Sequence, residues 1–212
     1  MNNITLKKLL PMDQNASTKQ SVLVLLKTET AEIHRRVEDV LNIRDPALSR
    51  AEYREILISF YKIYRPLEYR FVQHALLLSP DFNLELRLKT HLIQTDLIDL
   101  GCTDTQLNTI EDSEAFVDVN SSQTLIGALY VVEGATLGGQ LICRSLRQNL
   151  NLGNEAHRFF SGYGEKTGQM WKEFCRLATE STCPDDFAGV LLSAKLTFEA
   201  FYKQLSSRTA AS

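Results

Sequence analysis

Apolar residues recur every three or four positions along most of this chain. Between Ser21 and Leu41 they stand at positions 22, 25, 26, 33, 37, 40 and 41, which is the spacing of one face of an amphipathic helix. Similar spacing predicts further helices over 84–100, 122–150, 166–179 and 185–205, with a short helical or irregular stretch before position 116. No segment alternates apolar and polar residues well enough to predict a strand. The pattern predicts an all-α fold of seven to nine helices.

Several residues mark where these helices begin and end. Ser49 and Glu52 have the spacing of a capping box that opens a second long helix, and Pro66 is expected to kink or break that helix. Gly101 is placed to end the helix over 84–100, and residues 151–153 are expected to turn the chain.

The composition fits one globular domain. The chain has 212 residues, of which 44% are hydrophobic and 23% charged, enough to bury a single sizeable core. Glycine (10) and proline (5) are scarce, which disfavours β-sandwiches and barrels with many tight turns. We expect a flexible N-terminal arm over 1–17, a helical domain over 18–206 and a flexible tail over 207–212.

Charge and cysteine usage narrow the list of partners. The net charge is −3 and no run of Lys and Arg is present, so nucleic acid is not expected as a partner. No apolar run approaches 18 residues and the first residues do not resemble a signal peptide, so no membrane partner is expected. Cys102, Cys143, Cys175 and Cys183 are far apart and form no C-x-x-C pair, which is typical of a reducing compartment, and we expect a cytoplasmic protein.

The helix over 122–150 contains an unusual concentration of glycine. Gly127, Gly134, Gly138 and Gly139 fall within thirteen residues, although each glycine inside a helix costs roughly 0.5–1 kcal/mol relative to alanine. Gly134 and Gly138 share one helix face and would leave a flat strip of backbone. Close packing of a neighbouring helix against this strip is one explanation, and close approach of a ligand is another.

A histidine on the first predicted helix favours a ligand. His34 shares a stripe with Leu26, Thr30 and Leu41 and is expected to point inward, although a lone histidine on an apolar face is more often a core residue. Lys27 lies seven residues earlier, which is about 10 Å along the same face. One imidazole, one cation and a flat backbone strip suit a planar, apolar ligand with acidic groups at one edge, and haem fits that description.

Four segments resemble the heme oxygenase family. They are LKTETAEIHRRVED (26–39), YVVEGATLGGQ (130–140), FFSGYGEKTGQMWKEF (159–174) and AKLTFEAF (194–201). The last two are similar to the bacterial branch, particularly the enzymes that supply bilin to bacteriophytochromes, and the resemblance spans about 20–205.

The resemblance implies a site and a reaction. Haem would lie between a proximal and a kinked distal helix, with His34 ligating the iron through Nε2 and Glu38 as the partner of the other ring nitrogen. Gly134, Gly138 and Gly139 would form the distal kink. With O2 and electrons from a ferredoxin or a reductase, haem would serve as cofactor and substrate and be cut at a meso carbon to biliverdin, CO and Fe(II). A bacteriophytochrome is a candidate recipient of the biliverdin.

One distal position departs from part of the family. Animal and many cyanobacterial members have an aspartate directly after the first distal glycine, whereas this chain has Ala135. Thr136, Gln140 and backbone groups are then the candidates for organising distal water and delivering the proton.

The resemblance also suggests contacts for the propionates. Lys27 and Tyr130 are the better supported, whereas Lys172 and Arg176 have the spacing of an ordinary solvated helix face and rank lower. Two further residues, Phe198 and Phe201, are expected first as core residues and second as walls of the pocket.

Enzymes of other classes share a similar helical architecture. Di-iron and thiamin-degrading enzymes also use such helical folds, but a di-iron site needs Glu-x-x-His, and no glutamate precedes any of the four histidines, His34, His74, His91 and His157, at that spacing. No non-haem metal is therefore expected. The alternative is a haem carrier or sensor that binds without degrading, for which Ala135 is the one hint; a purely structural protein would leave His34 and the glycine strip unexplained.

Overall fold

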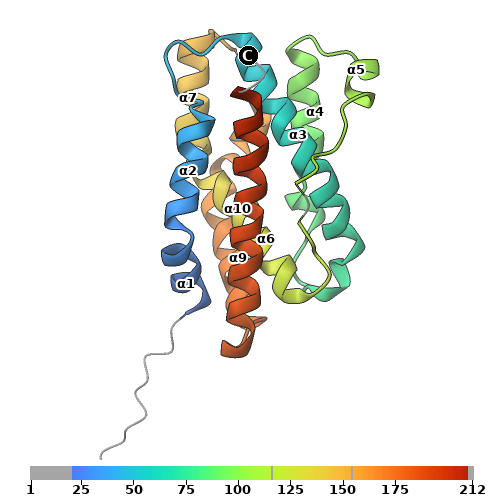
Figure 1. Cartoon of the computed structure of the whole chain (residues 1–212), viewed down its shortest axis with the longest axis vertical. Coiled ribbons are helices and arrows are strands. Elements are labelled where there is room, and N and C mark those ends of the chain that lie inside the picture. Colours follow the sequence, from blue (N-terminus) through green and yellow to red (C-terminus); the bar gives the residue numbers. More distant parts are fainter. Residues whose placement is uncertain (1–20, 116, 154, 210–212) are drawn as a thin grey trace, which may run out of the picture.

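The computed structural model describes residues 21–115, 117–153 and 155–209, and in these ranges the chain is helical with no strand (Figure 1). The α-helices are α1 (Val22–Glu29), α2 (Ala31–Leu41), α3 (Arg50–Gln73), α4 (Thr90–Asp99), α5 (Asp104–Asn108), α6 (Ser122–Gly134), α7 (Gly139–Leu150), α8 (Arg158–Ser161), α9 (Thr167–Glu180) and α10 (Phe187–Thr209). Short 3-10 helices are η1 (Ala75–Leu77), η2 (Glu85–Arg87), η3 (Ala135–Gly138), η4 (Gly164–Lys166) and η5 (Pro184–Asp186). The predicted all-α class is confirmed, with more and shorter helices than expected.

The long helix α10 lies in front of the other helices in Figure 1, between α2 and α3, and packs most extensively on α6, then on α2 and α3. The crossing with α6 depends on Gly127, where a Cβ would overlap the Val190 carbonyl oxygen and the side chain of Ser193. Ser193 Oγ also donates a hydrogen bond of 2.7 Å to the Thr124 carbonyl. Close helix packing therefore explains Gly127.

Two predicted helices have different limits in the structure. A nearby side chain divides one of them, and a side chain from another helix sets the start of the other. The helix expected over 21–41 is divided at Thr30, whose hydroxyl donates to the Leu26 carbonyl at 2.7 Å. The helix expected over 84–100 begins only at Thr90, because Glu68 of α3 accepts hydrogen bonds from the backbone N–H groups of Lys89 and Thr90 at 2.6 and 3.0 Å.

Of the kink or break expected at Pro66, the break does not occur, because α3 continues through that residue to Gln73. A proline has no N–H to give to the carbonyl four residues earlier, which here belongs to Lys62. The backbone N–H of Ser113 donates to that carbonyl at 2.9 Å. A segment far along the chain thus satisfies the group that the proline leaves free.

The segment over 122–150 is the core of the bundle and is interrupted by η3. By length and composition this segment could cross a membrane, because its most apolar stretch of 18 residues has a mean hydropathy of 1.4. Half of that stretch is buried inside the bundle, which is also typical of a core helix in a soluble protein.

The domain limits differ from expectation at the C-terminal end. Helix α10 continues through Thr209, three residues into the predicted tail. The predicted N-terminal arm over 1–17 lies outside the described residues, as do positions 210–212.

Candidate functional site

A cavity of about 450 Å3 lies between α2, the α6–η3 segment and α10. This volume falls within the roughly 300–1,000 Å3 typical of small-molecule sites. Its walls are mainly apolar and aromatic, and they are contributed by Val37, Leu41, Phe60, Tyr64, Tyr130, Val131, Leu137, Ile142, Phe159, Phe160, Trp171, Phe198 and Phe201. The remaining lining residues are Lys27, His34, Glu38, Lys89, Gly134, Ala135, Thr136 and Gly138.

The cavity contains most of the residues that the sequence singled out. Seven predicted site residues line it: Lys27, His34, Glu38, Tyr130, Gly134, Thr136 and Gly138. The predicted wall residues Phe198 and Phe201 line it as well, and both are also buried core residues. Residues separated by more than a hundred positions are thereby brought to one apolar cavity.

His34 occupies one wall of the cavity. Leu26 and Leu41 of its stripe are buried, but the His34 side chain itself is 53% exposed because it faces the cavity rather than the packed core. Its ring lies 5.3 Å from the ring of Phe198, measured between centroids. An imidazole presented to an apolar cavity and supported by an aromatic ring is suited to ligate a metal carried by a bound ligand.

Glu38 lies one turn after His34, beside its imidazole ring. Its Oε1 is 3.6 Å from His34 Nε2, the nitrogen assigned to the iron, instead of next to Nδ1. This distance is too long for a hydrogen bond. Glu38 lines the cavity beside the imidazole, and its role as the partner of the other ring nitrogen stays a prediction.

Lys27 and Tyr130 lie at the same cavity, as the propionate assignment requires. The Tyr130 ring packs on Trp171, with centroids 6.0 Å apart. Burial raises the pKa of the Tyr130 hydroxyl, and a hydrogen bond with Thr30 opposes this rise. The hydroxyl is therefore neutral at physiological pH, so Lys27 is the cation of this pair.

Lys172 and Arg176 do not reach the cavity. Both are exposed on α9, and the Arg176 guanidinium lies 4.0 Å from Glu180 one turn later. Their exposure fits a solvated helix face, and their assignment to the propionates stays a prediction.

The distal glycines have different roles. Gly134 and Gly138 line the cavity; a Cβ at Gly134 would meet only the Trp171 ring at 3.8 Å, and one at Gly138 would meet nothing within 4 Å. Gly139 is buried and outside the cavity, and a Cβ there would overlap the Phe160 carbonyl oxygen. Gly139 begins α7 directly after η3, and its lack of a side chain allows the close packing of the chain at Phe160.

Thr136 and Ala135 lie on the cavity side of η3. The Thr136 hydroxyl donates to the Glu133 carbonyl at 2.6 Å, which leaves the oxygen lone pairs available to accept a hydrogen bond. Gln140 is exposed and does not line the cavity. Of the polar distal candidates named from the sequence, Thr136 is thus the side chain that reaches the site.

Sequence reasoning missed two polar residues of the cavity, Lys89 and Tyr64. Lys89 is only 2% exposed and its ammonium group bonds to Glu133 Oε1 at 3.0 Å. Tyr64 is 1% exposed, and burial together with the nearby carboxylates of Glu68 and Glu133 raises the pKa of its hydroxyl. A signal was present in the sequence, because Glu133 directly follows the apolar run over 125–132, and a buried carboxylate needs a partner.

A second hollow adjoins the cavity. It has a volume of about 950 Å3, lies between the α2–α3 loop and the beginning of α7, and shares Glu38, Leu41, Gly138 and Ile142 with the first cavity. Gly138 therefore stands where the two spaces meet.

The other candidate metal ligands are dispersed. Across 21–115, 117–153 and 155–209 no group of three His, Cys, Asp or Glu side chains comes together. The four cysteines are free thiols, with Cys143 buried and Cys183 exposed. His91 is exposed, and His157 is buried, where its Nδ1 lies 3.1 Å from Ser161 Oγ, in agreement with their interpretation as surface and core histidines.

Comparisons with known proteins identify the fold and the family of this chain. Three solved heme oxygenases share the fold: that of Leptospira interrogans (16% identity, TM-score 0.75, covering 89% of this chain and 100% of that one), that of Synechocystis in complex with heme (15%, 0.71, 91% and 94%) and the NO- and CO-bound enzyme of Neisseria meningitidis (20%, 0.70, 90% and 92%). No match was found among curated protein sequences. The family model for heme oxygenase matches residues 20–207. The chain belongs to the heme oxygenase family and is accordingly a heme-degrading oxidoreductase.

Proposed function

We propose that haem binds in the cavity between α2 and the α6–η3 segment, with His34 as the axial ligand of the iron. One observation carries this proposal: a single accessible imidazole on α2 shares an apolar cavity with Gly134 and Gly138 of the α6–η3 segment. The imidazole suits iron, and backbone without Cβ atoms leaves room for a flat macrocycle. Lys27 would pair with the propionates at the rim.

The reaction proposed is cleavage of haem at a meso carbon to biliverdin, CO and Fe(II), with O2 and electrons from an external donor such as a ferredoxin or a reductase. Aromatic and aliphatic walls exclude bulk water from the ring, while Thr136 and the backbone near Gly134 remain on the α6–η3 side to hold ordered water. The free thiols fit a reducing compartment, and we place the reaction in the cytoplasm. A bacteriophytochrome is the proposed recipient of the biliverdin.

A non-degrading haem carrier or sensor is the competing function, and one experiment separates the two. The protein is reconstituted with hemin and then reduced in air by a ferredoxin system or by ascorbate. An enzyme loses the Soret band while a bilin absorption grows. A stable oxy complex that never converts would instead identify a carrier or sensor.

A further inference from the structure

A cluster of charged side chains is buried directly behind the α6 side of the cavity. It joins Arg87 and Lys89, which precede α4, to Glu133 on the last turn of α6 and Tyr163 before η4. The Arg87, Lys89 and Glu133 side chains are only 1–2% exposed. Burying three charges costs free energy unless each is paired and hydrogen bonded.

Every polar atom of Lys89 and Glu133 is paired. The Lys89 ammonium group donates to the Arg87 carbonyl at 2.9 Å, to Glu133 Oε1 at 3.0 Å and to the Tyr163 hydroxyl at 2.9 Å. The Tyr163 hydroxyl donates to Glu133 Oε1 at 2.6 Å, and Arg87 bonds to Glu133 Oε2. Burial and Glu133 raise the pKa of Tyr163, which keeps it a neutral donor.

Further charged groups complete the surroundings. Arg87 also bonds to Glu173 of α9 at 3.1 Å, so two cations face two carboxylates. On the α3 side, Glu68 accepts hydrogen bonds from backbone groups at the start of α4, and the buried Tyr64, whose pKa is raised by burial and by Glu68 and Glu133, lines the cavity. Arg87, Lys89, Glu133 and Glu173 together are formally neutral, but their charges are fixed in position.

Two members of the cluster meet the haem site. Lys89 lines the cavity, and Glu133 directly precedes Gly134, the first glycine of the cavity wall. Position 135, directly after that glycine, is an alanine and supplies no charge. Fixed charges in a site of low dielectric act strongly on a ligand nearby.

We propose that Lys89 and Glu133 are positioning residues of the haem site: their ion pair clamps the end of α6 and sets the electrostatic potential on the side of the cavity opposite His34, where Ala135 offers no charge. The inference rests on the proposed binding of haem in this cavity. Lys89 contributes positive potential at the cavity wall, and Glu133 contributes negative potential from behind it. Removing either charge should therefore shift the potential at the iron in opposite directions.

The test uses the ionisation of water bound to ferric haem, followed through the Soret band as pH is varied. Positive charge nearby favours hydroxide and lowers the pKa of metal-bound water. Lys89→Met should raise this pKa and Glu133→Gln should lower it. A unit charge about 10 Å away at an effective dielectric near 20 changes a pKa by roughly one unit, which sets the scale of both shifts.

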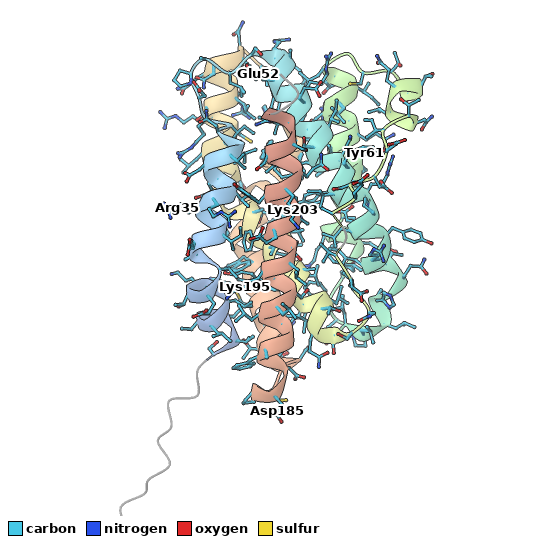
Figure 2. The ribbon with its side chains drawn as sticks, in the orientation of Figure 1. Arg35, Glu52, Tyr61, Asp185, Lys195 and Lys203 are labelled. Atoms are coloured by element: carbon cyan, nitrogen blue, oxygen red, sulfur yellow. The ribbon has the colours of Figure 1, made fainter. Side chains whose placement is uncertain are left out.

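Two control variants separate charge from packing. Tyr163→Phe removes hydrogen bonds from the same cluster without changing its charge, so its pKa should stay near that of the wild type. Lys195→Met removes an equal charge from an exposed pair with Glu29 on the face shown in Figure 2, where solvent screens it, and should also have little effect. Lys89→Met and Glu133→Gln should both lower the melting temperature of the haem-free protein.

The outcomes distinguish a failure of the proposed haem binding from a failure of the proposed electrostatic role. Failure of the wild type to form a haem complex would refute the proposed function itself. A complex whose water pKa moves in the same direction in both cluster variants, or stays unchanged in both, would refute the electrostatic role. If no ionisation occurs within the accessible pH range, the CO stretching frequency of the ferrous complex replaces it: Lys89→Met should raise that frequency and Glu133→Gln should lower it, and any other pattern would refute the role.

Discussion

Gly138 and Gly139 are neighbours with opposite roles, and alanine substitution separates them. Both residues have right-handed helical backbone angles, φ −82° and ψ −10° at Gly138 and φ −57° and ψ −40° at Gly139, so alanine is allowed at either position. The difference then comes from contacts alone. A Cβ at Gly138 meets nothing within 4 Å, whereas one at Gly139 overlaps the Phe160 carbonyl oxygen.

The expected free energies differ in sign. Alanine gains roughly 0.5–1 kcal/mol over glycine through helix propensity, so Gly138→Ala should stabilise the haem-free protein by about that amount. At Gly139 the same gain is opposed by an overlap with backbone, and overpacking of a core costs about 1–3 kcal/mol. Gly139→Ala should therefore destabilise the protein by up to about 2 kcal/mol.

Urea unfolding of the haem-free variants measures these differences directly, with the slope of the transition as a check that compactness is unchanged. A Gly139→Ala variant as stable as the wild type would refute the packing argument. Hemin binding should depend on position 138, which lines the cavity, and not on position 139. Gly138→Phe places a ring where the two hollows meet and should weaken hemin binding by about tenfold or more, roughly 1.4 kcal/mol. Its free energy of unfolding should stay near that of Gly138→Ala. Undiminished binding would contradict the assignment of Gly138 to the cavity.

Three further predictions concern single side chains. His34→Ala should abolish the imidazole-ligated haem spectrum, and added imidazole should restore it; an unchanged spectrum would mean that another residue ligates the iron. Lys27→Met should weaken hemin binding by up to about fivefold, as expected for a largely exposed ion pair, and should broaden the mixture of biliverdin isomers seen by chromatography, whereas Lys195→Met should do neither. Asp99→Asn should lower stability at pH 7 by less than about 1 kcal/mol. The hydrogen bond from Arg158 lowers the Asp99 pKa below its usual 3.8, so this contribution is complete above that value and lost as pH falls through the native pKa; a stability difference from the wild type that does not shrink as pH falls below 3.8 would contradict it.

The parts of the site that depend on local spacing were predictable from the sequence. The stripe that carries Lys27 and His34 follows from helical periodicity, and Gly134 and Gly138 follow from their spacing on one face. Periodicity does not show what a glycine faces, which is why Gly139 was grouped with them although it packs against Phe160.

Long-range contacts explain the other differences. Helix α3 passes through Pro66 because Ser113 bonds to the carbonyl that the proline leaves free, and α4 starts late because Glu68 caps it from another helix. Lys89 and Glu133 lie 44 positions apart, and no local pattern pairs them. An acidic residue at the end of an apolar helix is nevertheless a usable signal of a buried partner.

The central claim is that this chain degrades haem in the cavity that His34 lines, and product stoichiometry tests it most directly. The hemin complex is reduced in air by a ferredoxin system, and haem, biliverdin and CO are quantified in the same sample, with His34→Ala in parallel. The account predicts one biliverdin and one CO for each haem consumed by the wild type, and none from His34→Ala. Loss of haem without CO, or equal yields from both proteins, would contradict it.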